Sequence, residues 1–141
     1  MDLTKLDSTS FANLCDDLIK ASFPTAKCFE GRGGDRGIDC YIGDLEGMDL
    51  HIFQHKFLPK TLGSVGKGEI HNSLKTAKTN FKNLKKWILL LPKKFTFEEN
   101  EWFESLGKQY NVEIEVWDET ELKHLLYPFP SIRKDYLPLS E

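Results

Sequence analysis

Apolar residues recur at steps of three and four positions in four segments of the chain, a spacing that predicts amphipathic helices. Ser10 can cap the first of these helices, and Pro24 marks its end. The second follows a predicted loop over residues 59–68, and the third opens with the capping box Thr96-x-x-Glu99. The predicted helices cover, in order, residues 10–23, 70–84, 96–106 and 122–126.

Other segments have the pattern of strands. Residues 26–30 are extended, and residues 38–42 and 49–57 are strand-like runs that GDLEGM joins as a hairpin. The short apolar run at 87–91 fits a buried central strand, and residues 112–116 alternate between apolar side chains and glutamate. The order α-β-β-β-α-β-α-β-α predicts an α/β fold with a mixed central sheet flanked by helices.

The composition is that of one folded domain. A chain of 141 residues with 40% hydrophobic residues can bury a single core. We expect this domain to cover residues 1–127 and the proline-containing residues 128–141 to form a C-terminal tail or linker. The sequence has no long apolar run and no signal-peptide pattern, so we expect a cytoplasmic protein without a membrane partner.

Charge and cysteine placement narrow this picture. The net charge is −3, but residues 55–94 contain ten lysines and one acidic residue, which predicts a basic face for a polyanion. A solvated lysine face is the alternative explanation.

Cys15, Cys28 and Cys40 are widely spaced and odd in number, which argues against a disulfide framework and a zinc site. We therefore expect three buried free thiols in a reducing cytosol.

The sequence GGDRGIDC at residues 33–40 raises the question of a phosphate-binding loop. The dinucleotide fingerprint needs a helix after its glycines, whereas a predicted strand follows here. A second candidate, LGSVGKGE at 62–69, has Thr61 in place of the first P-loop glycine and Gly68 in place of the magnesium-binding Ser or Thr. The sequence therefore predicts no nucleotide cofactor site.

The hairpin gives the glycine-rich turn a different meaning. If the turn is centred on Glu46-Gly47, with Gly47 at positive φ, Asp39 lies opposite Gln54. Side chains alternate along a strand, so Gln54 and Lys56 share a face with Asp39 while His55 points away. A carboxylate and an amide oxygen are ligands suited to Mg²⁺, and Lys56 can orient water, accept a proton or neutralise charge. A buried Asp–Lys ion pair with a hydrogen-bonded glutamine is the structural alternative.

The sequence GGDRGID, followed by a hairpin and FQHK, resembles the PD-(D/E)xK nuclease superfamily and its Mrr-like restriction-endonuclease branch, which carries Q-x-K. This resemblance covers roughly residues 10–126 and implies a restriction-endonuclease-like fold. It implies that Asp39 and Gln54 bind Mg²⁺, for which Mn²⁺ can substitute. It also makes the main-chain carbonyl of His55 a further ligand and Lys56 the catalytic lysine.

Two positions depart from the family pattern. Ile38 stands where the superfamily name has proline, as is common in this branch. Ala12 occupies the position on the first helix where many relatives have glutamate, and Asp16 or Asp17 is the candidate to replace it. The loss of this acid leaves open whether one or two metal ions are used.

The predicted nucleic-acid contacts come from two regions. Arg32 and Arg36 lie beside the glycines, near the expected scissile bond, whereas Lys75, Lys78 and Lys82 can follow a phosphate backbone. The expected function is a Mg²⁺-dependent endonuclease acting on DNA in restriction or antiphage defence, alone or as the N-terminal effector of a longer protein with a sensor or nucleotide-hydrolysing module. A homodimer would supply the two sites needed to cut both strands. Two alternatives stay open: a Holliday-junction resolvase, and a catalytically degenerate domain for nucleic-acid binding or assembly.

Overall fold

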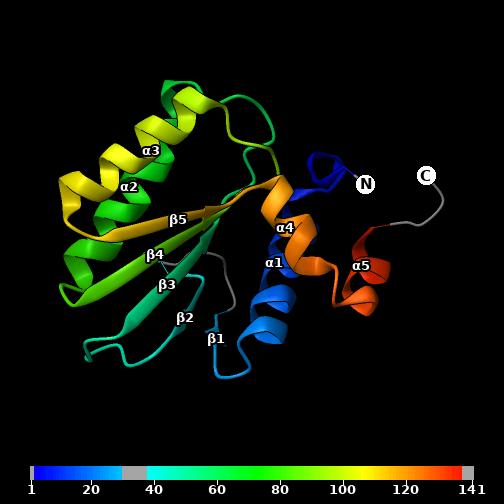
Figure 1. Cartoon of the computed structure of the whole chain (residues 1–141), viewed down its shortest axis with the longest axis horizontal. Coiled ribbons are helices and arrows are strands. Elements are labelled where there is room, and N and C mark those ends of the chain that lie inside the picture. Colours follow the sequence, from blue (N-terminus) through cyan, green and yellow to red (C-terminus); the bar gives the residue numbers. More distant parts are fainter. Residues whose placement is uncertain (1, 30–37, 138–141) are drawn as a thin grey trace.

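The chain has an α/β fold, in which helices surround a five-stranded mixed sheet (Figure 1). A computed structural model of the chain describes residues 2–29 and 38–137. Within them the strands are β1 (Lys27–Cys28), β2 (Cys40–Ile42), β3 (Leu50–His55), β4 (Leu84–Leu90) and β5 (Glu113–Trp117). The helices are α1 (Ser8–Ser22), α2 (Ser64–Asn80), α3 (Phe97–Tyr110), α4 (Glu119–Leu126) and α5 (Pro130–Tyr136), preceded by the 3-10 turn η1 (Leu3–Lys5). The predicted order of elements is confirmed through α4, and η1 and α5 are additions to it.

The strands lie in the sheet in their order along the chain, β1-β2-β3-β4-β5. β1, β2 and β3 pair antiparallel, whereas β4 pairs parallel with both β3 and β5. Parallel neighbours need a crossover connection, which α2 and α3 supply. The predicted mixed sheet is therefore confirmed, and its antiparallel half carries the hairpin of interest.

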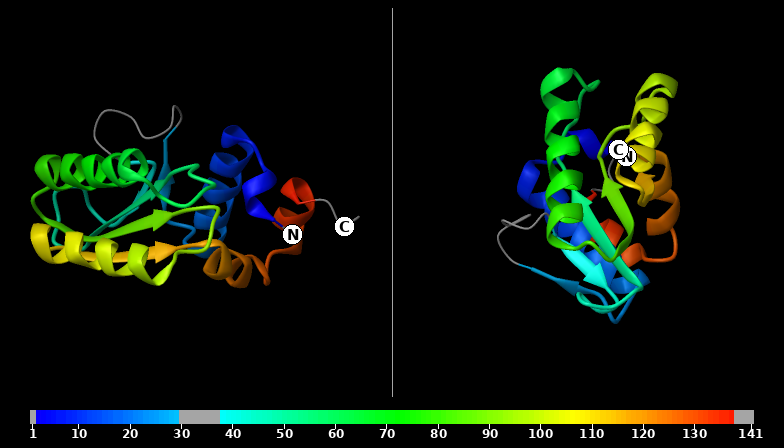
Figure 2. Two further views of the ribbon diagram at one scale, coloured as in Figure 1. Left: turned by 90° about the horizontal axis from the view of Figure 1, so that it is seen from above. Right: turned by 90° about the vertical axis from the view of Figure 1, so that its left-hand side faces the viewer.

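Helices cover both faces of the sheet. α2 and α3 run side by side on one face, and α1, α4 and α5 gather on the other (Figures 1 and 2). β4 shows the consequence for the sequence: Trp87 and Leu89 pack toward α2 and α3, whereas Ile88 and Leu90 pack toward α1 and α4. A strand that is buried on both faces is apolar at every position rather than at alternate ones, as WILLL is.

The hairpin of β2 and β3 has the predicted register. Cys40 pairs with Phe53 and Ile42 with His51. Continued by one residue beyond Cys40, this register places Asp39 opposite Gln54. The turn itself differs from the prediction, because Gly43, not Gly47, has a positive φ of 92° among the described glycines. A Cβ at Gly43 would lie 2.4 Å from the backbone oxygen of Asp49, so only glycine fits there.

Three helices, α1, α2 and α4, begin earlier than predicted, and α4 starts at Glu119 with Asp118 as its N-cap. α1 starts at Ser8 because the side chain of Asp7 accepts a hydrogen bond from the backbone of Ser10, so Asp7 is the N-cap and the prediction of Ser10 is wrong. α2 starts at Ser64, within the predicted loop over 59–68, and ends at Asn80. The predicted helix extends to Leu84, beyond the observed end of α2, whereas Leu84 is the first residue of β4.

The segment expected to be a tail or linker is helical in part. Pro130 occupies the first turn of α5, where its missing N–H costs nothing. Tyr136 donates a hydrogen bond from its hydroxyl to Asp17 Oδ2 at 2.5 Å, and Leu137 is buried in the core beneath α1. Residues 130–137 therefore pack against the domain, and residues 138–141 lie outside the described part of the chain.

Cys28 and Cys40 form a disulfide across β1 and β2. The two residues are directly opposite in the register of these strands, although they are 12 positions apart in the sequence. The prediction of three free thiols is therefore wrong for this pair. Cys15 is the free cysteine of the described residues, and it is buried in α1.

We expect the thiol count to follow this pairing. Unfolded in denaturant without reductant, the protein should react with a thiol reagent at one cysteine, and at three after reduction. Reduction should lower the free energy of unfolding by about 2–4 kcal/mol, because the crosslink limits the unfolded chain. Cys15→Ala is the control and should leave no reactive thiol without reductant; three reactive thiols in the untreated wild type would contradict the pairing.

A buried glutamate fixes the loop between β3 and α2. Glu99 in the first turn of α3 is 3% exposed and accepts hydrogen bonds from the backbone of Leu62 at 2.7 Å and of Thr96 at 2.8 Å. Lys93 pairs with the same carboxylate. Burial raises the pKa of Glu99, but the hydrogen bonds from Lys93, Thr96 and Leu62 outweigh it and lower the pKa below its ordinary value. The predicted capping box is confirmed, and its glutamate also holds a distant loop.

Glu99→Gln should lower the free energy of unfolding by about 3–5 kcal/mol at neutral pH, because it leaves the Lys93 ammonium buried without its partner. Since the folded-state pKa of Glu99 is depressed, its contribution is present above its ordinary pKa and is lost as the pH falls through the folded-state value. The difference between wild type and variant should therefore shrink in acid. Chemical denaturation at neutral pH and in acid measures the difference in the free energy of unfolding. The exposed neighbour variant Glu98→Gln is the control. Equal stability of Glu99→Gln and wild type at neutral pH would contradict the stabilising role of Glu99.

Candidate functional site

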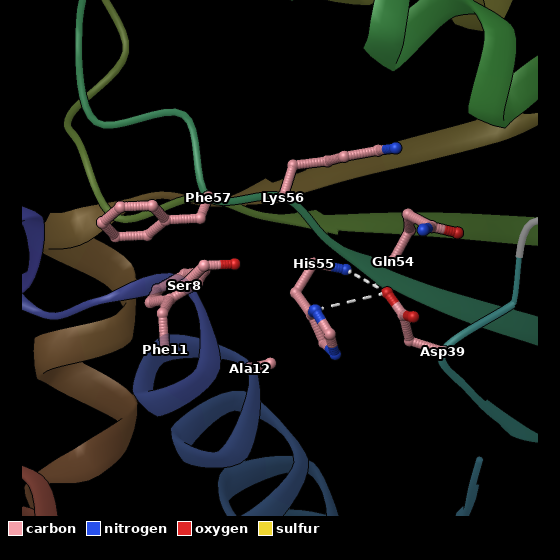
Figure 3. Close-up of a pocket in the computed structure, with 8 residues that line it drawn as sticks. All are labelled: Ser8, Phe11, Ala12, Asp39, Gln54, His55, Lys56 and Phe57. Carbon is pink, nitrogen blue, oxygen red and sulfur yellow. Dashed lines mark hydrogen bonds and ion pairs between the residues drawn. The ribbon is translucent and has the colours of Figure 1, made fainter. Parts of the chain in front are cut away.

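The three residues predicted to form the site line one cavity of about 210 Å³. Asp39 precedes β2, Gln54 lies in β3 and Lys56 directly follows β3 (Figure 3). The opposite wall comes from the first turns of α1 and from the residue after Lys56, namely Ser8, Phe11, Ala12 and Phe57. The sheet therefore brings the predicted residues together against the N-terminal half of α1.

Backbone hydrogen bonds fix these residues in place. The N–H of Asp39 donates to the carbonyl of Phe53 at 3.1 Å, and its carbonyl accepts from Phe29 at 2.9 Å. At the end of β3, the N–H of Lys56 donates to the carbonyl of Leu90 at 3.0 Å. The antiparallel half of the sheet thus positions Asp39, and the parallel half positions Lys56.

Two buried side-chain oxygens, on residues that line the cavity, have no hydrogen-bond partner among the described residues. They are Asp39 Oδ1 and Gln54 Oε1, and their residues are only 2% and 3% exposed. Buried polar atoms are almost always paired in folded proteins, and an unpaired one costs about 1–3 kcal/mol. The donor set is one carboxylate and one amide oxygen, which fits a hard divalent cation.

The side chains alternate as predicted, but Asp39 also reaches His55. Gln54 and Lys56 extend to one side of the strand and the ring of His55 to the other (Figure 3). Asp39 Oδ2 nevertheless accepts the backbone N–H of His55 at 2.7 Å and lies 3.4 Å from His55 Nδ1. The bend at Asp39, just before β2, lets its carboxylate turn toward His55.

Burial raises the pKa of Asp39, and this effect outweighs the opposing influence of the His55 ring and backbone N–H. Asp16 raises the same pKa further, and Lys56 lowers it. The ionised carboxylate is therefore incompletely compensated by its protein neighbours. A cation beside Oδ1 would supply the missing compensation.

One acidic residue on α1 reaches this group. Asp16 Oδ1 lies 3.2 Å from His55 Nε2 and 3.3 Å from Cys40 Sγ. Asp17 instead accepts a hydrogen bond from Tyr136. Ala12 lines the cavity and carries no acid there, so of the two candidates proposed to replace the missing glutamate, Asp16 is the one near the site. Its position one helical turn after Ala12 was the signal in the sequence.

A second cluster contains metal-ligating residue types but differs from the predicted site. Donor atoms of Asp16, Cys28 and Cys40 lie within 4.8 Å of one another. Because the two sulfurs are bonded to each other, they provide no thiolate ligand in this form.

The residues predicted to bind nucleic acid are not gathered at the cavity. Arg32 and Arg36 lie outside the described residues. Lys75 and Lys78 lie in the second half of α2, and Lys82 lies just before β4 begins. Since His55 pairs with the last residue of β4, Lys82 is separated from the cavity by the length of that strand, about 20 Å. None of the three lysines lines the cavity.

Comparisons of the chain with models of protein families and with curated proteins give no match. Of the helices within the described residues, none has the length and apolar character to cross a membrane. The function is therefore inferred from the residues of the cavity and from the excess of lysine in residues 55–94.

Because a buried oxygen of Asp39 has no partner among the described residues, we expect the Asp39→Asn substitution to raise stability to denaturant without metal and to lower it, relative to wild type, with metal. Without metal at pH 8, this variant should unfold at a higher denaturant concentration than wild type, because ionisation of a group with a raised folded-state pKa destabilises the folded state. With Mg²⁺ or Mn²⁺ the order should reverse, since only wild type gains binding free energy, about 2.7 kcal/mol at one hundred times the Kd.

Lowering the pH through the raised pKa of Asp39 should weaken metal binding by wild type, because protons compete for the carboxylate. Denaturation with and without metal measures both effects, and the exposed Glu98→Gln variant should behave as wild type does. Equal metal stabilisation of Asp39→Asn and wild type would place the cation elsewhere.

Proposed function

We propose that the chain is a Mg²⁺-dependent endonuclease domain of the PD-(D/E)xK type, in its Q-x-K form, that hydrolyses phosphodiester bonds in DNA. The observation that carries this proposal is that Asp39 and Gln54, which line one cavity with Lys56, each have a buried side-chain oxygen without a hydrogen-bond partner among the described residues. The restriction-endonuclease-like fold is part of the proposal. The α/β order and the mixed sheet are consistent with it.

The roles follow from the chemistry of each side chain. Asp39 Oδ1 and Gln54 Oε1 would hold the ion, with the carbonyl of His55 as a further ligand. When bound, Mg²⁺ supplies a Lewis acid and an activated water molecule. The Lys56 ammonium carries a full positive charge on a flexible stem, and it neutralises the negative charge that develops on the attacked phosphate. Phe11 and Phe57, with ring centroids 5.8 Å apart, form an apolar wall that limits water in the cavity.

The substrate assignment rests on charge. Residues 55–94 combine ten lysines with one acidic residue, and Lys75 and Lys82 are exposed. Such a surface attracts a phosphate backbone without reading its sequence. Together with Arg32 and Arg36, these lysines would extend the contact beyond the scissile bond. We assign the activity to restriction or antiphage defence, with the domain acting as a homodimer or as the effector part of a larger protein.

Cleavage of plasmid DNA in Mg²⁺ or Mn²⁺ tests the proposal. Asp39→Ala and Lys56→Ala should each reduce the cleavage rate by about 10³-fold, because each removes several kcal/mol of transition-state stabilisation. DNA binding, measured by fluorescence anisotropy, and the fold should persist in both variants. Lys60→Ala, an exposed lysine four positions after Lys56, is the matched control and should cleave at nearly the wild-type rate.

Two outcomes would contradict the proposed endonuclease. Preferential cutting of four-way junctions over plasmid would favour a junction resolvase. Tight DNA binding by wild type with no cleavage in either metal ion would favour a non-cutting nucleic-acid-binding domain.

A further inference from the structure

The imidazole of His55 lies between two carboxylates that come from different elements. Its Nε2 is 3.2 Å from Asp16 Oδ1 on α1, and its Nδ1 is 3.4 Å from Asp39 Oδ2, just before β2. The side chain of His55 is 7% exposed, and that of Asp39 is 2% exposed. This chain of three residues connects the helix layer to the sheet at the edge of the cavity. Figure 3 shows its Asp39 and His55 members.

The contacts divide the two oxygens of Asp39 between different tasks. Oδ2 accepts the His55 backbone N–H at 2.7 Å and also faces the ring of the same residue. Oδ1 has no partner among the described residues and belongs to a residue that lines the cavity. Because Oδ2 is held by these contacts, the carboxylate cannot rotate freely, and Oδ1 keeps one orientation.

Asp16 fixes the ring from its other end. A histidine ring held at one nitrogen can still swing about its side-chain bonds, whereas contacts at both nitrogens define its plane. The neighbouring carboxylate makes a different contact, because Asp17 Oδ2 accepts the hydroxyl of Tyr136. The two consecutive acids of α1 therefore serve different partners, and only Asp16 reaches His55.

We propose that the side chains of His55 and Asp16 position Asp39, and that they raise the affinity of the site for a divalent cation without touching the ion themselves. This inference rests on the proposed function, in that it takes Asp39 as a metal ligand. Removing an outer partner of this kind typically costs about 10–100-fold in metal affinity.

The test measures Mn²⁺ affinity directly, from the electron paramagnetic resonance signal of the free ion, with no DNA present. His55→Phe keeps the backbone N–H to Asp39 and removes both ring contacts, and Asp16→Asn keeps the size of its side chain and removes the charge. Each variant should raise the Kd for Mn²⁺ by about tenfold or more. Because Asp16 acts through His55, the double variant should bind within about twofold of His55→Phe alone.

Asp17→Asn is the matched control, and its Kd should equal that of wild type. Thermal unfolding without metal identifies variants that fold as wild type does; if the buried His55→Phe does not fold, Asp16→Asn decides the test. In cleavage assays, raising the Mn²⁺ concentration should restore the rate of Asp16→Asn but not that of Lys56→Ala. A Kd within twofold of wild type for folded Asp16→Asn, or multiplying effects in the double variant, would overturn the positioning role.

The outcomes separate this inference from the proposed function. If Asp39→Asn abolishes Mn²⁺ binding while Asp16→Asn and His55→Phe leave it intact, the metal site stands and the positioning role is wrong. If Asp16→Asn and His55→Phe weaken Mn²⁺ binding as expected but wild type does not cleave DNA, the positioning role stands and the endonuclease activity is wrong. If wild type binds no Mn²⁺, both are wrong.

Discussion

The register of β2 against β3 is the constraint on which the site depends. Successive side chains on a strand point to opposite faces, so a slip of one residue would move Gln54 away from Asp39 and place an apolar side chain in the cavity. Cys40 and Phe53 face each other on the side of α1, and Ile52 packs toward α2 and α3. A shift would therefore expose or misplace core residues as well. The need to bury these residues fixes the geometry of the polar ones.

Buried polar groups in this protein are of two kinds. Glu99 accepts hydrogen bonds from several partners, and its carboxylate stabilises the loop that follows Lys56. Asp39 and Gln54 are as deeply buried, yet each has an oxygen with no partner among the described residues. Two buried and incompletely paired polar residues that line the same cavity are typical of functional sites, where local stability is sacrificed for chemistry.

Much of the fold, but less of the site, follows from local patterns in the sequence. Hydrophobic periodicity was sufficient for the order of helices and strands, and alternation was sufficient for the faces of Gln54 and Lys56. The Cys28–Cys40 bond was missed because it depends on the pairing of β1 with β2, and a strand of two residues has no sequence pattern that reveals its partner. The contact of Asp39 with His55 was missed because it results from a bend before β2, which alternation does not describe.

The Cys28–Cys40 bond has a consequence for how the chain could diversify. It clamps both ends of the segment between β1 and β2, directly beside Asp39, and this segment contains Arg32 and Arg36. Because the bond holds Cys28 opposite Cys40 whatever lies between them, related sequences could differ in the length and composition of that segment without changing the pairing of β1 with β2.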